Sequence, residues 1–294
     1  MFPDTRGDGE TVLRQSQLVM LRILKIVDYI CRKHNIKYWL DGGTLLGAIR
    51  HDGFIPWDDD IDIVMPREDY IRFIDVAGKE LPEDLFLQSQ ETDIFYDMPW
   101  IKVRDNKSKI IEYKVGNYHN GMFIDIFPMD TYGGNQCKIK RRKKEFKLLY
   151  KTLILVKEPF ESISSKKILI KNVVKGSLKT ILFPYTLMSR EKVFKRLEYI
   201  KKRLGSSSLD EEGEFLGYGM DVIFWNLFID KKTIYPLKLH KFEDGEFFVP
   251  NDWDGYLTQL FGDYMKLPQE EERIPHNLGL VPILTVEEKE SLSL

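Results

Sequence analysis

The feature that most constrains this chain is a run of four carboxylates within five positions, in the stretch WDDDIDIV. The four residues are Asp58, Asp59, Asp60 and Asp62. Strand-forming residues follow at once, and side chains on a strand alternate between its two faces. Asp58, Asp60 and Asp62 are therefore predicted to share one face, while Ile61 and Ile63 turn towards the core. Such crowded carboxylates repel one another unless a cation lies among their oxygens, and Mg²⁺ or Mn²⁺ prefers ligands of this kind.

A solvent-exposed acidic turn would also explain these four residues, and on their own they leave that alternative open. An EF-hand does not fit, because the positions that need Gly and Glu hold Ile63 and Asp69. Upstream, Gly42 and Gly43 separate a predicted buried strand from a short predicted helix at 44–50, with Thr44 as its N-cap. Two glycines let backbone N–H groups approach a phosphate, and a helix N-terminus favours negative charge. Glycines followed by carboxylates on the next strand indicate a phosphate and metal site.

Hydrophobic periodicity predicts an α/β (α+β) fold, with a mixed sheet flanked by helices. Amphipathic helices are expected at 10–34 and 66–81, and a final helix at 252–264. Strands are expected at 61–65, 86–90, 100–105, 109–115 and 122–130, the last of them ended by Pro128.

Charge divides the chain into an acidic body and a basic middle. The net charge is −2, yet residues 138–203 hold 21 Lys and Arg against 5 Asp and Glu, and the rest holds 23 against 41. We therefore expect a catalytic core at 1–137, a basic helical insertion at 138–210, and a segment at 211–294 that completes the core.

The insertion alternates lysines with aliphatic blocks, a pattern typical of amphipathic helices on an anionic membrane surface. A helical subdomain with its lysines in solvent is the alternative interpretation. The first 15 residues lack the apolar segment of a signal peptide, and no run approaches the ~18 apolar residues of a spanning helix. Cys31 and Cys137 lie far apart, without metal-ligand spacing. We expect a cytoplasmic protein, peripheral on the inner face of the cytoplasmic membrane, that binds no nucleic acid.

Four collinear blocks carry a family resemblance. Residues 36–70, IKYWLDGGTLLGAIRHDGFIPWDDDIDIVMPREDY, resemble the LicD family of phosphocholine transferases, to which the fukutin-related proteins are akin. The segments KVRD at 102–105, FIDIFPMD at 123–130 and FEDGEFFVPNDWDGYLTQLFGDYMKLP at 242–268 agree with it. The two glycines and the Asp-x-Asp also resemble the signature of the nucleotidyltransferase fold. The basic middle is not covered.

The resemblance implies a metal-dependent transferase. It would move a phospho-substituent, phosphocholine or a phosphoalditol, from a CDP-activated donor such as CDP-choline to a hydroxyl group. The acceptor would be a cell-surface glycan of a capsule, teichoic acid or lipopolysaccharide, or its lipid-linked precursor. Three alternatives stay open: a nucleotidyltransferase that adds NMP to a hydroxyl, a DxD glycosyltransferase, and a membrane-docked scaffold without activity.

Asp60 and Asp62 match the Asp-x-Asp and are the expected Mg²⁺ or Mn²⁺ ligands and catalytic residues, with Asp58 as a third or supporting carboxylate. Asp125 is a charge inside an apolar strand, so it needs a partner. We interpret it as a metal ligand or as the base for the acceptor hydroxyl, and an ion pair with Lys or Arg is the alternative.

Two further groups of residues are expected around the donor. The phosphate-binding set is Gly42, Gly43, Thr44, Arg50, His51, Lys102 and Arg104. The alternative interpretation is a surface loop position for His51 and solvent-exposed strand positions for Lys102 and Arg104. The substrate-binding set is Trp57, Glu243, Asp263, Tyr264 and His276, for which helix packing or core packing is the competing interpretation.

Overall fold

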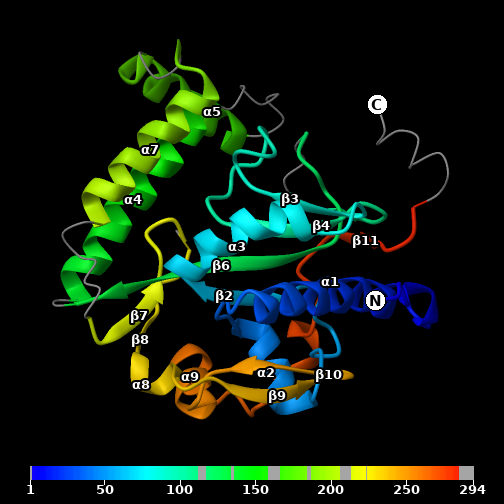
Figure 1. The fold of residues 1–294 in the computed structure, drawn as a ribbon. Coiled ribbons are helices and arrows are strands. Elements are labelled where there is room, and N and C mark those ends of the chain that lie inside the picture. The colour runs from blue at the N-terminus through cyan, green and yellow to red at the C-terminus, as the bar shows by residue number, and fades with distance from the viewer. Residues whose placement is uncertain are drawn as a thin grey trace. The chain divides into compact units, whose positions relative to one another are not determined.

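The structure, a computed structural model, describes residues 2–111, 117–133, 136–157, 166–183, 187–205, 213–222 and 224–284 (Figure 1). The chain divides into two compact units. The first comprises Met1–Thr131, Glu214–Val222 and Leu227–Leu294, and the second comprises Tyr132–Gly213 and Ile223–Asn226. The basic insertion expected at 138–210 therefore falls inside the second unit.

The first unit is built on a mixed sheet with the strand order β1-β2-β6-β4-β3, to which β7 and β8 are added beside β6. The strands are β1 (Trp39–Leu40), β2 (Asp62–Pro66), β3 (Leu85–Gln88), β4 (Ile101–Asp105), β6 (Phe123–Tyr132), β7 (Phe215–Tyr218) and β8 (Phe228–Asp230). β2 and β6 are parallel, whereas β1–β2, β6–β4, β4–β3 and β7–β8 are antiparallel. The predicted α+β class is confirmed.

Two small two-stranded sheets complete the strands. β9 (Lys238–Phe242) and β10 (Gly245–Val249) form a hairpin, and β5 (Lys109–Ile111) pairs with β11 (Gly279–Val281) near the C-terminus. The predicted strand at 109–115 is thus observed over its first three residues, and residues 112–115 lie outside the described part of the chain.

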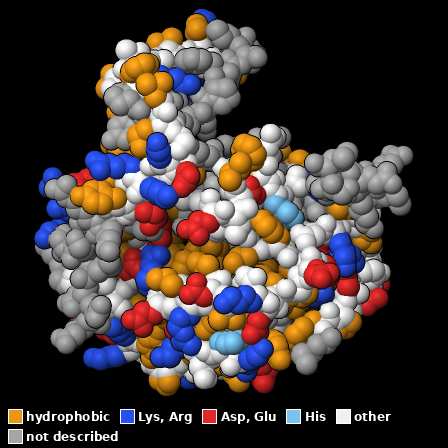
Figure 2. All heavy atoms as spheres, turned by 45° about the horizontal axis from the view of Figure 1, so that its top comes forward, with side chains coloured by type: hydrophobic (Ala, Val, Ile, Leu, Met, Phe, Trp, Pro, Cys, Tyr) orange, Lys and Arg blue, Asp and Glu red, His pale blue; other side chains and the backbone are white. Residues whose placement is uncertain are grey.

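Helices cover the sheet of the first unit. α1 (Val12–Lys33) packs against β4, and α3 (Arg67–Glu80) packs against β2 and β3 (Figure 1). The remaining helices are α2 (Gly42–His51), α8 (Lys231–Ile234) and α9 (Trp253–Phe261), with short 3-10 turns η1 (Arg6–Asp8) and η2 (Glu270–Glu272). On the face drawn in Figure 2, the coloured acidic and basic side chains are interspersed among hydrophobic ones.

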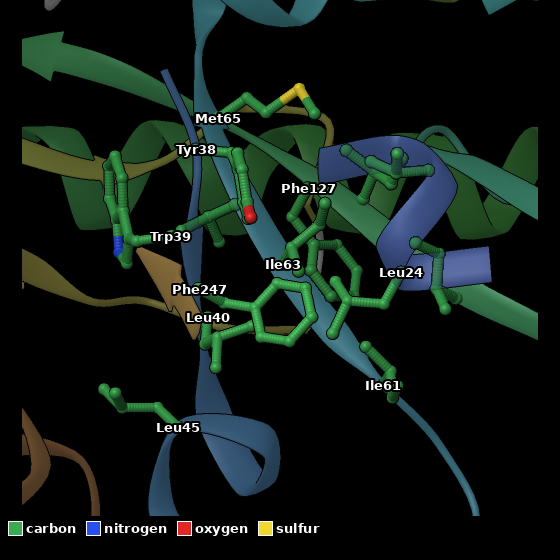
Figure 3. Close-up of a cluster of buried hydrophobic side chains, with 14 of the residues drawn as sticks. Leu24, Tyr38, Trp39, Leu40, Leu45, Ile61, Ile63, Met65, Phe127 and Phe247 are labelled. Atoms are coloured by element: carbon green, nitrogen blue, oxygen red, sulfur yellow. The ribbon is translucent and has the colours of Figure 1, made fainter. Parts of the chain in front are cut away.

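The core confirms that Ile61 and Ile63 face inward, although β2 begins at Asp62, so Asp58 and Asp60 precede the strand. Ile61 and Ile63 are completely buried. Figure 3 shows Ile63 pointing towards Leu24 of α1 and Phe247 of β10, which come from distant parts of the sequence. Burying a side chain of this size stabilises the fold by about 1.5–3 kcal/mol. These residues therefore fix which face of the strand the neighbouring aspartates occupy.

Two local predictions are wrong. Helix α2 begins at Gly42 with Asp41 at its N-cap position, and the Thr44 hydroxyl accepts a hydrogen bond from the Asp62 N–H, 2.9 Å away. β6 does not end at Pro128 but continues to Tyr132. Its pairing with β4 ends at Ile126, so the N–H that proline lacks is not needed by that strand, while the Pro128 carbonyl accepts from the Gly219 N–H.

Most described residues of the second unit are helical. Its long helices are α4 (Gln136–Lys157), α5 (Lys166–Ile181) and α7 (Arg190–Gly205). α4 and α7 share a small apolar core of Phe146, Tyr150, Leu153, Val193, Phe194 and Leu197. Within the described parts of the chain, no helix combines the length and the apolar character needed to cross a membrane.

Candidate active site

The centre of the site is a pair of aspartates on neighbouring parallel strands. Asp62 opens β2 and stands in register with Asp125 of β6, and the Asp125 N–H bonds to the Ile61 carbonyl at 2.8 Å. Residues in register on adjacent strands project to the same face of a sheet. The sheet therefore brings together two carboxylates that are 63 positions apart in the sequence.

The first turn of α2 lies against the acidic segment. The Asp41 N–H bonds to the Asp62 carbonyl at 3.0 Å, which ties the start of α2 to the start of β2. A Cβ on Gly43 would lie 3.0 Å from Asp58 Oδ2, and one on Gly42 would lie 3.3 Å from Asp62 Oδ2. Gly42 also has a φ of +52°, a conformation that favours glycine. The glycine pair thus leaves room for two carboxylates at a helix N-terminus.

Asp41 belongs to this site, although the sequence analysis did not select it. The side chain is almost completely buried, and its carboxylate accepts hydrogen bonds from the Tyr218 and Tyr256 hydroxyls, the latter at 2.7 Å. Burial raises the pKa of Asp41. The two tyrosines come from β7 and α9, so Asp41 joins three distant segments at the point where α2 begins. In the sequence, the position of Asp41 directly before Gly42 and Gly43 was the feature that could have indicated its place in the site.

Asp125 has two partners. Lys102 of β4 is its register neighbour and donates to it from Nζ at 3.0 Å, and the Trp100 indole N–H donates at 2.7 Å. Burial nevertheless raises the pKa of Asp125. The ion pair named as the alternative to a metal or base role is therefore present, and it holds the carboxylate in place beside Asp62.

Asp59 takes a structural part that the sequence analysis missed. Its fully buried carboxylate accepts from the His276 N–H at 2.8 Å, the Asn277 N–H at 2.9 Å and the Asn277 side-chain amide at 3.0 Å. Strand-like alternation read from the sequence puts Asp59 on the opposite side to Asp58 and Asp60, which was the signal for a separate role. Asp59 fastens the C-terminal segment to the acidic run.

His276 reaches the acidic segment through the same contact. Its Nδ1 lies 3.1 Å from Asp60 Oδ2, and this hydrogen bond raises the pKa of His276 to about 9. Together, Asp58, Asp59 and His276 place ligand-type atoms within 4.8 Å of one another. Because three N–H groups already occupy the Asp59 oxygens, we do not assign Asp59 as a ligand.

Negative charge accumulates at the face shared by β2 and β6. Burial and then the nearby Asp60 carboxylate raise the pKa of Asp58 to about 8. Burial, followed by Asp60 and Asp125, raises the pKa of Asp62 well above its ordinary value. Within the described residues, no hydrogen-bond donor or basic side chain contacts the Asp62 carboxylate. Because so little positive charge lies beside these buried carboxylates, a bound cation would stabilise their ionised forms.

The residues fit a hard divalent cation. Asp58, Asp60 and Asp62 supply oxygen atoms only, and the side chains of Asp60 and Asp62 keep part of their surface exposed. Oxygen ligands with an open side match Mg²⁺ or Mn²⁺, which also keep substrate oxygens in their coordination shell. Asp125 lies within reach of the same set through its register with Asp62.

The predicted phosphate-binding residues do not all lie together. Arg50 and His51 end the ten-residue α2, so their backbone is roughly 12 Å from the glycine pair along the helix axis. Arg50 donates to the Tyr264 carbonyl at 2.8 Å. Trp57 has the guanidinium of Arg273 over its ring at 5.3 Å. These residues form a basic and aromatic group beyond the other end of α2.

Lys102 and Arg104 are both buried, so the interpretation of two solvated strand charges is wrong. Arg104 donates to the Gln88 side chain and to the Gly121 carbonyl at 2.7 Å, and its guanidinium lies 4.6 Å from the Phe123 ring centre. Lys102 is the member of the pair that contacts the aspartates, through Asp125.

The other C-terminal candidates make contacts that stabilise the fold. Glu243, in the β9–β10 turn, binds the Arg14 guanidinium at 2.5 Å and the Phe54 N–H at 3.2 Å. The Tyr264 hydroxyl donates to Asp254 at 2.5 Å, while Asp263 is exposed. Of the C-terminal set, His276 is the residue that contacts the acidic segment.

Comparison with known proteins identifies the family of the chain. Residues 35–164 match the family model described as LicD/FKTN/FKRP, nucleotidyltransferase domain. The lipopolysaccharide cholinephosphotransferase LicD of Haemophilus influenzae is 36% identical over 279 residues, which cover 92% of this chain and 98% of that protein. The human and mouse ribitol 5-phosphate transferases FKRP are 56% identical over 103 residues, or 35% of this chain and 19% of theirs. The chain belongs to the LicD family of phosphotransferases.

Proposed function

We propose that this chain transfers a phospho-substituent, phosphocholine or a phosphoalditol, from a CDP-activated donor to a hydroxyl group of a cell-surface glycan or its lipid-linked precursor. One observation carries the proposal: Asp58, Asp62 and Asp125 converge at the glycine-led N-terminus of α2. The named activities of the relatives, cholinephosphotransferase and ribitol 5-phosphate transferase, support a phosphorus-containing group as the unit transferred.

The first turn of α2 is the proposed site for the donor diphosphate. The Thr44 hydroxyl accepts a hydrogen bond from the Asp62 N–H and so holds the start of β2 against α2. Gly42 and Gly43 lack side chains that would cover their backbone, and a helix N-terminus attracts negative charge. The donor phosphates would therefore lie between the glycine backbone and the aspartates.

The carboxylates of Asp58, Asp60 and Asp62 would hold a divalent cation. When bound, Mg²⁺ or Mn²⁺ neutralises charge on the donor diphosphate and on the leaving group. His276, bound to Asp60, limits the positions that the Asp60 carboxylate can adopt. Asp59 would act only through the C-terminal segment that it holds.

Asp125 is the proposed acceptor of the hydroxyl proton. Lys102 and Trp100 fix the carboxylate, and its raised pKa makes it a better proton acceptor than an ordinary aspartate. The acceptor oxygen forms a bond to the phosphorus that carries the substituent. The bond from that phosphorus to the bridging oxygen breaks, CMP leaves with the electron pair, and the proton passes to Asp125. The competing role for Asp125 is that of a further metal ligand beside Asp58, Asp60 and Asp62.

A donor screen followed by product analysis tests the proposal. Thermal shift with CDP-choline, CDP-glycerol, CDP-ribitol and UDP-sugars, each with Mg²⁺ or Mn²⁺, identifies the donor, because a ligand of the native state raises the melting temperature. Mass spectrometry of the acceptor then distinguishes the reactions. We expect the acceptor to gain the phospho-substituent with release of CMP. An acceptor that gains a nucleotide, or turnover of a UDP-sugar alone, would contradict the proposal.

A further inference from the structure

Helix α5 of the second unit exposes several apolar side chains. Ile170, Val173 and Ile181 are 64%, 61% and 74% exposed, whereas Lys175 on the same helix has no exposed surface. A helix at the surface of a protein normally buries its apolar stripe and exposes its lysines. The exposed apolar face of α5 is therefore suited to an apolar medium rather than to water.

The exposed apolar side chains of α5 lie on one side of the helix and form an apolar stripe, which Ser177 and Thr180 interrupt between Val174 and Ile181. Its members on α5 are Leu169, Ile170, Val173, Val174 and Ile181, and Phe183 extends it just beyond the helix. At 3.6 residues per turn these positions span roughly 140° of the helix circumference, and the helix is about 24 Å long. α5 packs on α4 by its other side. Contiguous apolar patches such as the one formed by Leu169, Ile170, Val173 and Val174 mark interaction surfaces.

The positive charge beside the stripe indicates that its partner is negatively charged. Lys166, Lys167 and Lys171 are exposed, and α5 contains no Asp or Glu. Residues 138–203 as a whole carry 21 basic and 5 acidic residues. A second copy that packed the same face symmetrically against this one would bring the same positive charge, and like charges disfavour that contact. A surface with both negative charge and an apolar interior matches the stripe and its lysines.

We infer that α5 docks the protein on an anionic membrane surface. The apolar stripe lies in the boundary between headgroups and acyl chains, and the exposed lysines contact anionic headgroups. With 16 residues, α5 is shorter than the about 20 residues that a spanning helix needs, so it lies in the plane of the surface. The inference does not depend on the proposed reaction.

Vesicle co-sedimentation of the full chain tests the docking. The vesicles contain phosphatidylethanolamine with about 30% phosphatidylglycerol, or phosphatidylcholine alone. The test variant is Ile170→Glu with Val173→Glu, both at exposed positions, so the core is not disturbed. We expect at least about tenfold weaker binding to the anionic vesicles, because each change replaces an inserted apolar group with a like charge. The control is Ile71→Glu on α3, where Ile71 is 53% exposed.

A second variant separates charge from apolar contact. Replacing Lys166, Lys167 and Lys171 by Gln keeps the stripe and should weaken binding to anionic vesicles, as added salt should for the wild type. Far-UV circular dichroism confirms that each variant is folded. Equal binding to both kinds of vesicle, or wild-type binding by the Ile170→Glu/Val173→Glu variant, would overturn the inference. The inference would also be overturned if the wild type is a dimer and the Ile170→Glu/Val173→Glu variant is a monomer that binds vesicles as the wild type does.

The vesicle result is independent of turnover. If the donor screen fails while the α5 variant loses vesicle binding, the docking stands and the proposed reaction falls. If transfer to a soluble acceptor proceeds while vesicle binding is absent, the reverse holds. Activity of the α5 variant on a soluble acceptor should equal that of the wild type.

Discussion

The first turn of α2 offers a test in which stability and activity should separate. In Gly43→Ala, the added Cβ would lie 3.0 Å from Asp58 Oδ2, and the carboxylate must move by a few tenths of an ångström to relieve the contact. Metal ligands tolerate deviations of about 0.2 Å, and a misplacement of about 1 Å can reduce the rate about 100-fold. We expect about a tenfold loss in kcat/KM together with weaker Mn²⁺ binding.

The stability of Gly43→Ala should change little. Alanine in place of glycine in a helix stabilises by up to about 1 kcal/mol, which offsets the cost of moving Asp58. The matched control is Gly78→Ala in α3, where an added Cβ would meet nothing within 4 Å. This control should raise the free energy of unfolding by about 0.5–1 kcal/mol and leave activity unchanged.

Urea unfolding and initial-rate assays on both alanine variants supply the measurements. Wild-type activity and wild-type Mn²⁺ affinity in Gly43→Ala would refute the reasoning, because Asp58 would then not need the space that the glycine provides. A large loss in the free energy of unfolding of Gly43→Ala would instead refute the expectation that the helix propensity of alanine offsets the cost of moving Asp58.

Three further predictions concern single side chains. Asp125→Asn should abolish turnover while retaining wild-type Mn²⁺ binding by electron paramagnetic resonance, and weakened binding would make Asp125 a ligand instead of the base. Asp59→Asn should lower the free energy of unfolding in urea by about 2–3 kcal/mol, because the new side-chain NH2 group would face the N–H donors of Asn277. The Asn277 backbone amide should then exchange faster with solvent. Unchanged protection of this amide would contradict the fastening role of Asp59. Burial lowers the pKa of His119 to about 4 from 6.5, so the unfolded state binds the proton first as pH falls. The wild type should therefore lose up to about 2 kcal/mol between pH 7 and pH 5, and His119→Gln should lose less.

The sequence predicted the arrangement of β2 because its information is local. The alternation of Asp60, Ile61, Asp62 and Ile63 determines which side chains face the core once one face is buried, and both isoleucines are indeed fully buried. The glycine pair before α2 and the family resemblance placed the same segment at the site.

Contacts between distant segments could not be predicted in the same way. Nothing near Asp41 indicates that its partners are Tyr218 and Tyr256, and nothing near Asp59 indicates the N–H groups of residues 276 and 277. The sequence indicated that Asp125 needs a partner but not that register would supply Lys102. For the basic insertion the sequence left open whether the apolar faces of its helices are exposed or packed, because periodicity shows that a helix has an apolar face but not which way that face points.

The central claim is that the aspartates at the start of β2 hold a divalent cation for a cytidine diphosphate donor. Titration of Mn²⁺ by electron paramagnetic resonance, with and without CDP-choline, measures this directly in the wild type and in Asp60→Ala and Asp62→Ala. We predict one saturable site that the donor tightens, and its loss in both folded variants. Mn²⁺ binding of equal affinity in the wild type and both variants would contradict the claim.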